Sequence, residues 1–221
     1  MQKLYWATLI GVAMIAAACA AFTVAGQVQS GRYALIMKDP ERALAYLLQA
    51  AENEPNYIYT SMNFSESVWT YVGRAQYALG RYKEARGSFE RALSVYPPDA
   101  MAQLYLGLTL LRTGDRAEGL RSIQLGLKGL HAWIEHLNRV TPYYAFWDPN
   151  GTIRKEIDKT LATISGERVE PIQTIIESAE WIGQQMEEEV DKVRASERRQ
   201  FQRDLDRNGR RGFGFGLGIG F

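Results

Sequence analysis

Few side chains in this sequence could carry out chemistry. The chain has one cysteine, Cys19, and two histidines, His131 and His136. A five-residue spacing does not place both histidines on one helix face, and no cysteine or acidic cluster accompanies them to complete a zinc site. We interpret both as structural histidines and expect neither a metal nor a cofactor.

One segment resembles the first half of a calcium-binding loop. Asp204, Asp206 and Asn208 alternate before Gly209, as ligands and turn glycine do in an EF-hand. The position that needs a bidentate glutamate holds Phe215, and two arginines that follow Gly209 would repel a cation. We therefore prefer a helix end at Asn208–Gly209.

Other catalytic patterns are missing from the sequence. It has no Gly-x-Ser-x-Gly elbow, His-Glu-x-x-His helix, phosphate loop or dinucleotide fingerprint. The run Glu187–Glu189 has the character of a solvated helix face. We therefore predict that the protein is not an enzyme and has no catalytic residues.

Composition points to a folded protein without a nucleic-acid partner. The 26 basic and 25 acidic residues give a net charge of +1, whereas a domain that neutralises phosphates usually has a clear basic excess. Apolar residues make up 46% and charged residues 23%, which is ordinary globular usage.

The N-terminus carries a long uncharged run. Leu4 to Ala25 would span ~33 Å as a helix, enough to cross a bilayer. Lys3 before the run favours export of everything after it. We predict that residues 1–25 are a signal or anchor segment that forms a hydrophobic helix. It would hold the domain at a membrane of a bacterial cell envelope, on the extracytoplasmic (periplasmic) side.

Three fates of this segment stay open. It could be a retained anchor. It could instead be a cleaved signal, because Thr23-Val24-Ala25 supplies small residues for a signal peptidase. Finally, Ala16-Ala17-Ala18-Cys19 resembles a bacterial lipoprotein box, in which Cys19 is the lipidation candidate.

The elements that follow repeat themselves. One set of small, aromatic and turn residues comprises Gly73, Gly80, Ala85, Phe89, Ala92 and Pro97. A shift of 34 residues gives Gly107, Gly114, Gly119, Ile123 and Gly126, and a shift of 42 residues the other way gives Gly31, Ala43, Leu47, Ala50 and Pro55. The extra eight residues indicate an insertion near Ile58 to Ser65. Small residues let two antiparallel helices approach closely, while Trp69, Tyr82 and Phe89 fill the space between them.

This pattern resembles the tetratricopeptide repeat (TPR) family, in which helix pairs of 34 residues stack into a solenoid. The resemblance implies an all-α fold with about three repeats, at residues 24–57, 66–99 and 100–133. The middle copy matches best. The third is weak in its second helix, where Gly119 and Gly126 replace alanines, and the first is convincing only in its second helix.

A helical extension is predicted beyond the solenoid. Apolar spacing extends the last repeat helix through Arg139, so the solenoid occupies residues 26–140 and an aromatic loop residues 141–151. Residues 152–209 would form the extension, with a shorter helix and then a long amphipathic helix that Pro171 opens. Its apolar stripe comprises Ile172, Ile175, Ala179, Ile182, Met186, Val190 and Val193. The first half of this helix should cap the open end of the solenoid.

Residues 210–221 form a tail in which glycine alternates with apolar residues. In an extended chain Phe213, Phe215 and Phe221 would share one face, as in a strand that adds to a partner's sheet. A flexible end or a surface of a homo-oligomer is the alternative.

The TPR resemblance places a binding groove on the first helix of each repeat. Its predicted partner-binding residues are Arg74, Tyr77, Met101, Leu104, Leu108, Leu111 and Arg112, an apolar floor with Arg74, Tyr77 and Arg112 at the edge. The guest could be a segment of a partner protein or this chain's own C-terminal helix. We expect an adaptor or scaffold that binds protein partners through this groove and the C-terminal helix and tail. The alternative is a structural subunit of a homo-oligomer or larger membrane complex, assembled through that helix and tail.

Overall fold

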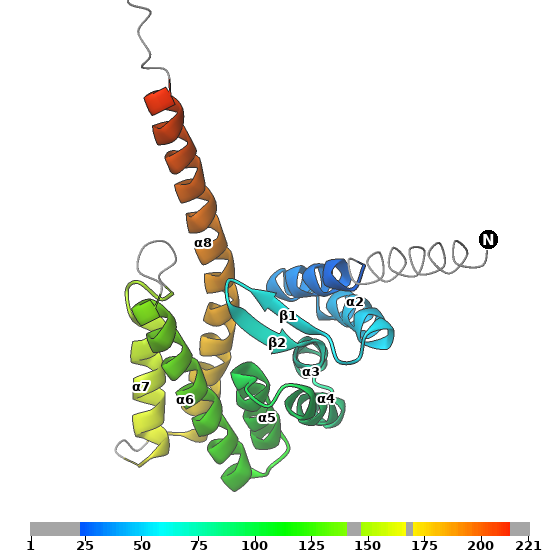
Figure 1. Ribbon diagram of the computed structural model, residues 1–221. Helices are drawn as coiled ribbons and strands as arrows, with labels where there is room; N and C mark the ends of the chain where they lie inside the picture. The colour runs from blue at the N-terminus through cyan, green and yellow to red at the C-terminus, as the bar shows by residue number, and fades with distance from the viewer. Residues whose placement is uncertain (1–22, 141–146, 167–169, 213–221) are drawn as a thin grey trace, which may run out of the picture.

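The computed structural model describes residues 23–140, 147–166 and 170–212, with side chains described as far as residue 205. The predicted all-α solenoid with a C-terminal helical extension is confirmed. Residues 23–36 form the first described helix. It is followed by α2 (Pro40–Asn53), α3 (Val68–Ala78), α4 (Tyr82–Val95), α5 (Ala100–Arg112), α6 (Arg116–Val140), α7 (Thr152–Ile164) and α8 (Ile172–Gly212) (Figure 1).

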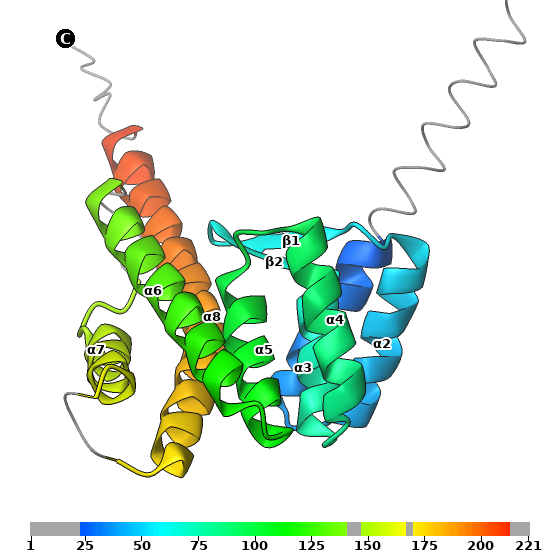
Figure 2. The ribbon, with the colours of Figure 1, turned by 90° about the horizontal axis from the view of Figure 1, so that it is seen from below.

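The helices from residue 23 to α6 form three antiparallel pairs, in agreement with the three predicted repeats. Neighbouring helices pack against one another in chain order from α2 to α6 (Figure 2). The turns within the second and third pairs use the predicted glycines, since Gly80 and Gly114 have φ of 72° and 95°. These angles suit glycine, which has no Cβ to clash. The predicted continuation of the last repeat helix is also confirmed, because α6 ends at Val140.

Glycine lets the helices of a pair come into close contact. A Cβ atom at Gly73 would lie 2.6 Å from the ring of Phe89, and one at Gly107 would lie 2.6 Å from the backbone nitrogen of Ile123. The third repeat differs from the prediction in this respect. A Cβ atom at Gly126, interpreted as a weak substitute for alanine, would lie 2.6 Å from the backbone nitrogen of Leu104. The glycines therefore tighten this pair.

The insertion between the first two repeats is a β-hairpin, which the sequence analysis did not predict. Strands β1 (Ile58–Ser61) and β2 (Phe64–Ser67) pair antiparallel, and the turn residues Met62 and Asn63 both have positive φ. A two-residue hairpin turn of this kind matches the right-handed twist of its strands. Phe64 anchors the hairpin on the third repeat, with its ring centroid 4.8 Å from that of Trp133.

The long helix α8 joins the whole body together. It packs against α5 and α7, and its predicted apolar stripe from Ile175 to Val193 is buried. The second half runs beyond the body (Figure 1). The predicted helix end at Asn208–Gly209 is wrong, because α8 continues to Gly212 and takes in the first residues of the predicted tail.

The predicted membrane segment lies almost entirely outside the described residues. Among those described, the structure contains no helix with the length and apolar character needed to span a bilayer. Cys19 and the tail residues Phe213, Phe215 and Phe221 also lie outside, so their predicted roles stay predictions.

Candidate functional site

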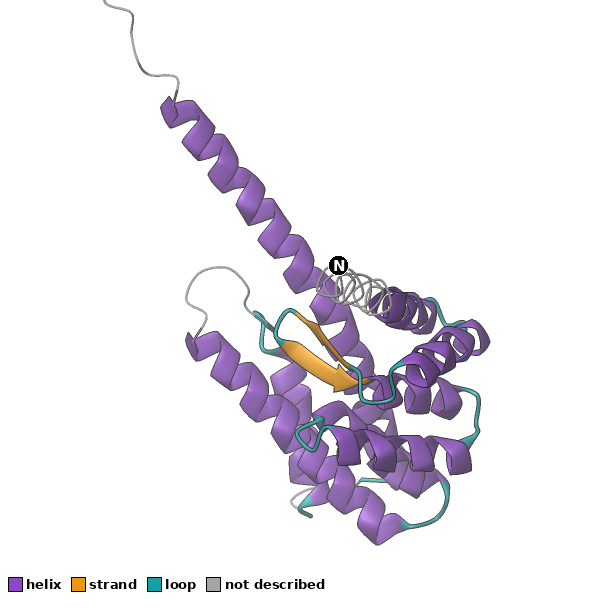
Figure 3. Ribbon diagram, turned by 45° about the vertical axis from the view of Figure 1, so that its right-hand side comes forward, coloured by secondary structure: helices purple, strands orange, loops and turns teal. Residues whose placement is uncertain are grey.

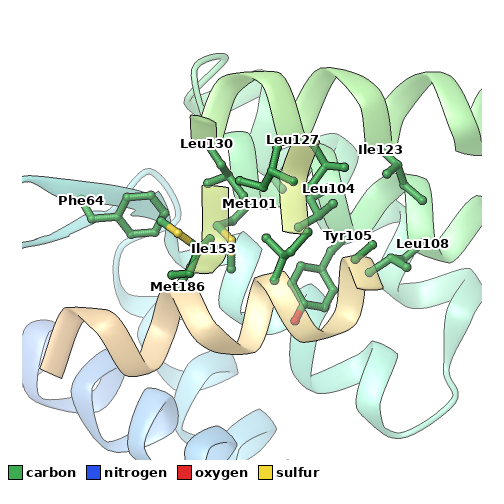
Figure 4. Packing of buried hydrophobic residues seen from close by; sticks show 14 of the residues in the cluster. Phe64, Met101, Leu104, Tyr105, Leu108, Ile123, Leu127, Leu130, Ile153 and Met186 are labelled. Carbon is green, nitrogen blue, oxygen red and sulfur yellow. The ribbon is translucent and has the colours of Figure 1, made fainter. Parts of the chain in front are cut away.

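The predicted groove is occupied by the chain's own helix α8. The side chains of Met101, Leu104 and Leu108 are 0% exposed. They belong to the apolar core that α5, α6, α7 and α8 share, in which Leu104 and Leu108 point from α5 toward α8 (Figure 4). Leu111 is half-buried against the same core. The expectation that these side chains form an open apolar floor for a partner is therefore corrected, and the self-occupied alternative describes the structure.

A glycine on α8 makes this fit possible. A Cβ atom at Gly183 would lie 2.6 Å from the hydroxyl oxygen of Tyr105 on α5. Any larger residue at position 183 would push the helix outward, since packed interiors leave no room for an added methyl group. Ile182 and Met186 beside it are fully buried.

Next to this apolar contact lies a buried cluster of charges. Arg32 of the first described helix donates to Glu187 of α8 over 2.6 Å and to the Glu187 carbonyl oxygen over 2.8 Å. Arg74 of α3 donates to the other oxygen of the Glu187 carboxylate. Two repeats thus contact one α8 carboxylate from two sides. The interpretation of Glu187–Glu189 as a solvated face is wrong for Glu187 and Glu189, which are buried.

A second carboxyl group, Glu66 of β2, completes the cluster. It accepts from the Tyr71 hydroxyl over 2.5 Å and from Arg74 over 3.4 Å. Burial, together with the nearby Glu187 carboxylate, raises the pKa of Glu66 well above its usual range. At Glu187 burial acts in the same direction, but Arg74 and Arg32 outweigh it and lower the pKa. Glu66 therefore keeps its proton to higher pH than a free glutamate does, and Glu187 is the ionised partner of the two arginines.

The arginines are held in the charged form. Burial alone would lower the pKa of Arg74 and of Arg32, but the Glu187 carboxylate reverses the direction and raises both. Arg74 also stacks over the rings of Tyr71 and Tyr105, at 5.5 and 5.2 Å from their centroids. Among the described residues no buried side-chain nitrogen or oxygen lacks a hydrogen-bond partner. The cluster is a satisfied network, which is the condition under which buried charges are tolerated.

An open cleft of about 410 Å³ lies beside the cluster. Its lining comes from the first described helix, α3, α4, α5 and α8, and comprises Leu35, Ile36, Lys38, Arg74, Tyr77, Ala78, Tyr82, Tyr105, Glu180, Gln184, Glu187 and Glu188. Of the predicted site residues, Arg74 and Tyr77 line this cleft. Arg112 stands at its edge, donating to the Tyr77 oxygen over 3.2 Å and to Glu180 over 2.9 Å.

The wall of the cleft is rigid and aromatic. Burial raises the pKa of Tyr77, so its hydroxyl stays protonated and donates to Glu180. The ring of Tyr77 meets those of Tyr82 and Tyr105 edge to face, at 5.4 and 5.7 Å. The cleft therefore presents tyrosine faces between paired charges, a surface suited to recognition.

Other residues on the predicted concave face have structural roles. Ser67 and Thr70, at the start of α3, are 0% exposed. The Asp99 carboxylate accepts from the Ser67 backbone N–H at 2.8 Å, the Thr70 hydroxyl at 2.6 Å and the Ala102 backbone N–H at 2.9 Å. Asp99 thus caps α5 and ties it to α3. The sequence signal was available, since an Asp before a helix is a preferred cap.

The described chemistry-bearing residues form no metal centre. His131 lies 3.5 Å from Asp158 at a half-exposed position. Within the described ranges no group of three or more His, Cys, Asp or Glu residues could hold a metal ion. The candidate site is thus the cleft and the ion cluster beneath it.

Comparison with known proteins identifies one repeat family in part of the chain. The model of the tetratricopeptide repeat family matches residues 73–125, from α3 into α6. This stretch of the chain therefore carries the tetratricopeptide repeat pattern. No curated protein matches it. TPR domains generally mediate protein–protein interaction, which supports an adaptor or scaffold role. In this TPR domain the face that usually receives a partner is largely filled by α8, and the open part is the tyrosine-lined cleft.

Proposed function

We propose that this protein is a non-enzymatic TPR adaptor that holds a segment of a partner protein in the cleft between α3 and α8. The observation that supports this role most strongly is the cleft itself, with Tyr77, Tyr82 and Tyr105 on its wall. Tyrosine and arginine are the residues that most often dominate binding energy at protein interfaces.

The cleft is preorganised for binding. Its α8 wall is fixed by the buried pairs of Glu187 with Arg32 and Arg74, and its rim by the pair of Arg112 with Glu180. Because the side chains of the cleft are already held in place, a partner segment that binds there orders few of them. Little of the contact energy is then lost to conformational entropy. Lys38 also lines the cleft, and its ammonium group can donate to a guest backbone.

We further propose that the domain works at a bacterial cell envelope, on the extracytoplasmic side. The uncharged run Leu4 to Ala25 supports this location. The sequence places the first repeat from residue 24, where this run ends, so the repeat domain would lie close to the membrane. The intact mass of the membrane-purified protein tests the proposal, because it separates a full-length chain, a chain cleaved after Ala25 and a chain with diacylglycerol on Cys19.

Two glutamines of α8 provide a matched test of the cleft. Gln184 lines it, whereas Gln173 does not, although both are exposed and each donates to a glutamate four residues further on. With benzoylphenylalanine at either position in cells, we expect a discrete cross-linked partner from position 184 alone. Tyr82→Ala should weaken this cross-link. Equal cross-linking from both positions, or none from position 184, would contradict the proposal.

The structural-subunit alternative is supported by the exposed second half of α8. It is tested by the native mass of the chain with and without residues 213–221. A fall in mass on removal of these residues would favour assembly through the tail.

A further inference from the structure

The second half of α8 is a helix without a packed partner in the described chain. After Val193, the last buried residue of the stripe, the helix leaves the body (Figure 3). Phe201 and Leu205 are 66% and 55% exposed. Arg194 fixes the root of this segment, since it donates to the hydroxyl of Ser61 on the hairpin over 2.5 Å. We call residues 194–205 the arm.

Charges of opposite sign lie on opposite faces of the arm. Arg199 and Arg203 are four residues apart and Arg198 adjoins them, so at 100° per residue the three share one side. Glu197 and Asp204, seven residues apart, share the other. The three arginines are exposed, whereas both acids are half-buried.

The arginines of the basic face are not engaged in ion pairs with the part of the chain that the structure describes. Among the described residues no ion pair joins Arg198, Arg199 or Arg203 to a carboxylate. The arm therefore presents three exposed arginine side chains on one side of the helix. Guanidinium binds phosphate through two parallel N–H donors, which makes arginine well suited to phosphate surfaces.

We propose that the arm binds the headgroup phosphates of an anionic lipid bilayer through its basic face. Phe201 and Leu205 lie between the basic and the acidic side by the same helical geometry, next to Arg198. A helix with apolar side chains beside arginines lies in the bilayer interface, with its apolar groups among the upper acyl chains.

The charge pattern favours a lipid surface over an acidic protein. Arg199 and Arg203 lie one turn apart with Arg198 on their flank. The exposed Phe201 and Leu205 beside Arg198 would be buried in a bilayer interface, whereas a purely acidic partner would leave them exposed. Beyond the arm the sequence adds Arg207, Arg210 and Arg211 against the single acid Asp206, and helix α8 continues to Gly212. The presence of a membrane near the arm rests on the proposed location, but the affinity of the arm for anionic lipid does not.

Fluorescence of a labelled arm tests the proposal on the full chain. Gln202, an exposed residue close to Arg198 on the helix surface, is replaced by cysteine and labelled with an environment-sensitive dye, with Cys19 replaced by serine. Vesicles of phosphatidylcholine, with or without phosphatidylglycerol, are then titrated. We expect a blue shift that depends on phosphatidylglycerol and weakens with salt. Each arginine near the surface should contribute roughly fivefold in affinity, so R198Q/R199Q/R203Q should lose about 100-fold.

The matched control neutralises the opposite face. E197Q/D204Q removes two negative charges and adds none. It should bind the vesicles at least as tightly as the parent chain. A blue shift that does not depend on phosphatidylglycerol, or a triple arginine variant that binds as tightly as the parent, would overturn the proposal. A response to polyglutamate but not to vesicles would overturn it too, in favour of an acidic protein. Cosedimentation with pure phosphatidylcholine reports separately on the N-terminal run, so a failure of the anchor and a failure of the arm are distinguishable.

Discussion

The two halves of α8 use similar residues in different surroundings. In the first half Glu187 is 2% exposed and accepts from Arg32 and Arg74, which belong to two different repeats. In the arm Glu197 is half-buried and has no ion-pair partner among the described residues. The apolar side chains differ in the same way, since Ile182 is fully buried while Phe201 is mostly exposed.

This difference shows that contact with the solenoid determines what each half of α8 does. Where the concave face is available, α8 contributes to the core and to a specific ion cluster. Beyond Val193 little of the described chain contacts the same helix, and Arg198, Arg199 and Arg203 are exposed. Stability should therefore depend on the first half, and binding outside the body on the second. Four measurements test this division.

The largest effect is expected at Glu187. Glu187→Gln would leave two buried guanidinium groups without their carboxylate, and breaking a buried pair costs about 3–5 kcal/mol in unfolding free energy. Glu197→Gln in the arm should change it by less than about 0.5 kcal/mol. Urea denaturation followed by circular dichroism measures both. Similar losses in the two variants would erase the distinction between the halves.

Gly183 tests the apolar contact. Gly183→Ala places a methyl group 2.6 Å from the Tyr105 hydroxyl oxygen and should cost about 1–3 kcal/mol by overpacking. Its control is Gly87→Ala on α4, where no atom lies within 4 Å of the added Cβ. Because alanine favours helix, the control should gain about 0.5–1 kcal/mol. The sign of the two changes, from thermal melts, is the readout, and a stabilising Gly183→Ala would disprove close contact at this position.

Glu66 sharpens the comparison through pH. Its raised pKa means that the folded chain still holds a proton at a pH where the unfolded chain, above about pH 4.3, has released it. The free energy of unfolding therefore falls as the pH rises from about 4.3 toward the pKa of Glu66 in the folded chain. Glu66→Gln mimics the protonated form and lacks this dependence. We expect the variant to match the parent near pH 4 and to be the more stable of the two at pH 8. Parallel stability curves across this range would show that Glu66 is ionised in the fold.

The smallest effect is expected in the arm. Phe201→Ala should change the unfolding free energy by less than about 0.5 kcal/mol because the ring is 66% exposed. Ile182→Ala, which creates a cavity, should cost about 2–5 kcal/mol. Both are read from the same urea curves. A large loss at Phe201 would reveal packing that the described residues do not show.

The sequence predicted the parts of the fold that follow from periodicity. The repeat register rests on small residues such as Gly73 and Gly107, whose spacing records helix contact directly. The stripe of α8 was also visible, because a 3.6-residue period marks a buried face. The hairpin was not, since Ser61, Met62 and Asn63 carry no strong turn signal such as Asn-Gly.

The candidate site was predicted in part for a related reason. Arg74, Tyr77 and Arg112 were selected from their repeat positions and do meet at the cleft. Arg32 and Glu187, the strongest contact beneath it, are far apart in sequence, and no local pattern links them. One sign was present, because Glu187 follows Gly183 by four residues and shares its close-packed face.

The pair of Arg32 with Glu187 has a consequence for folding. It joins residues 155 positions apart, near the two ends of the described body. In a simple repeat array each unit contacts only its neighbours, so terminal repeats can unfold on their own. Here the last helix closes on the first, and the end repeats cannot fray independently. The domain should unfold in one cooperative step, and a chain emerging from synthesis reaches its full stability only after α8 has been made.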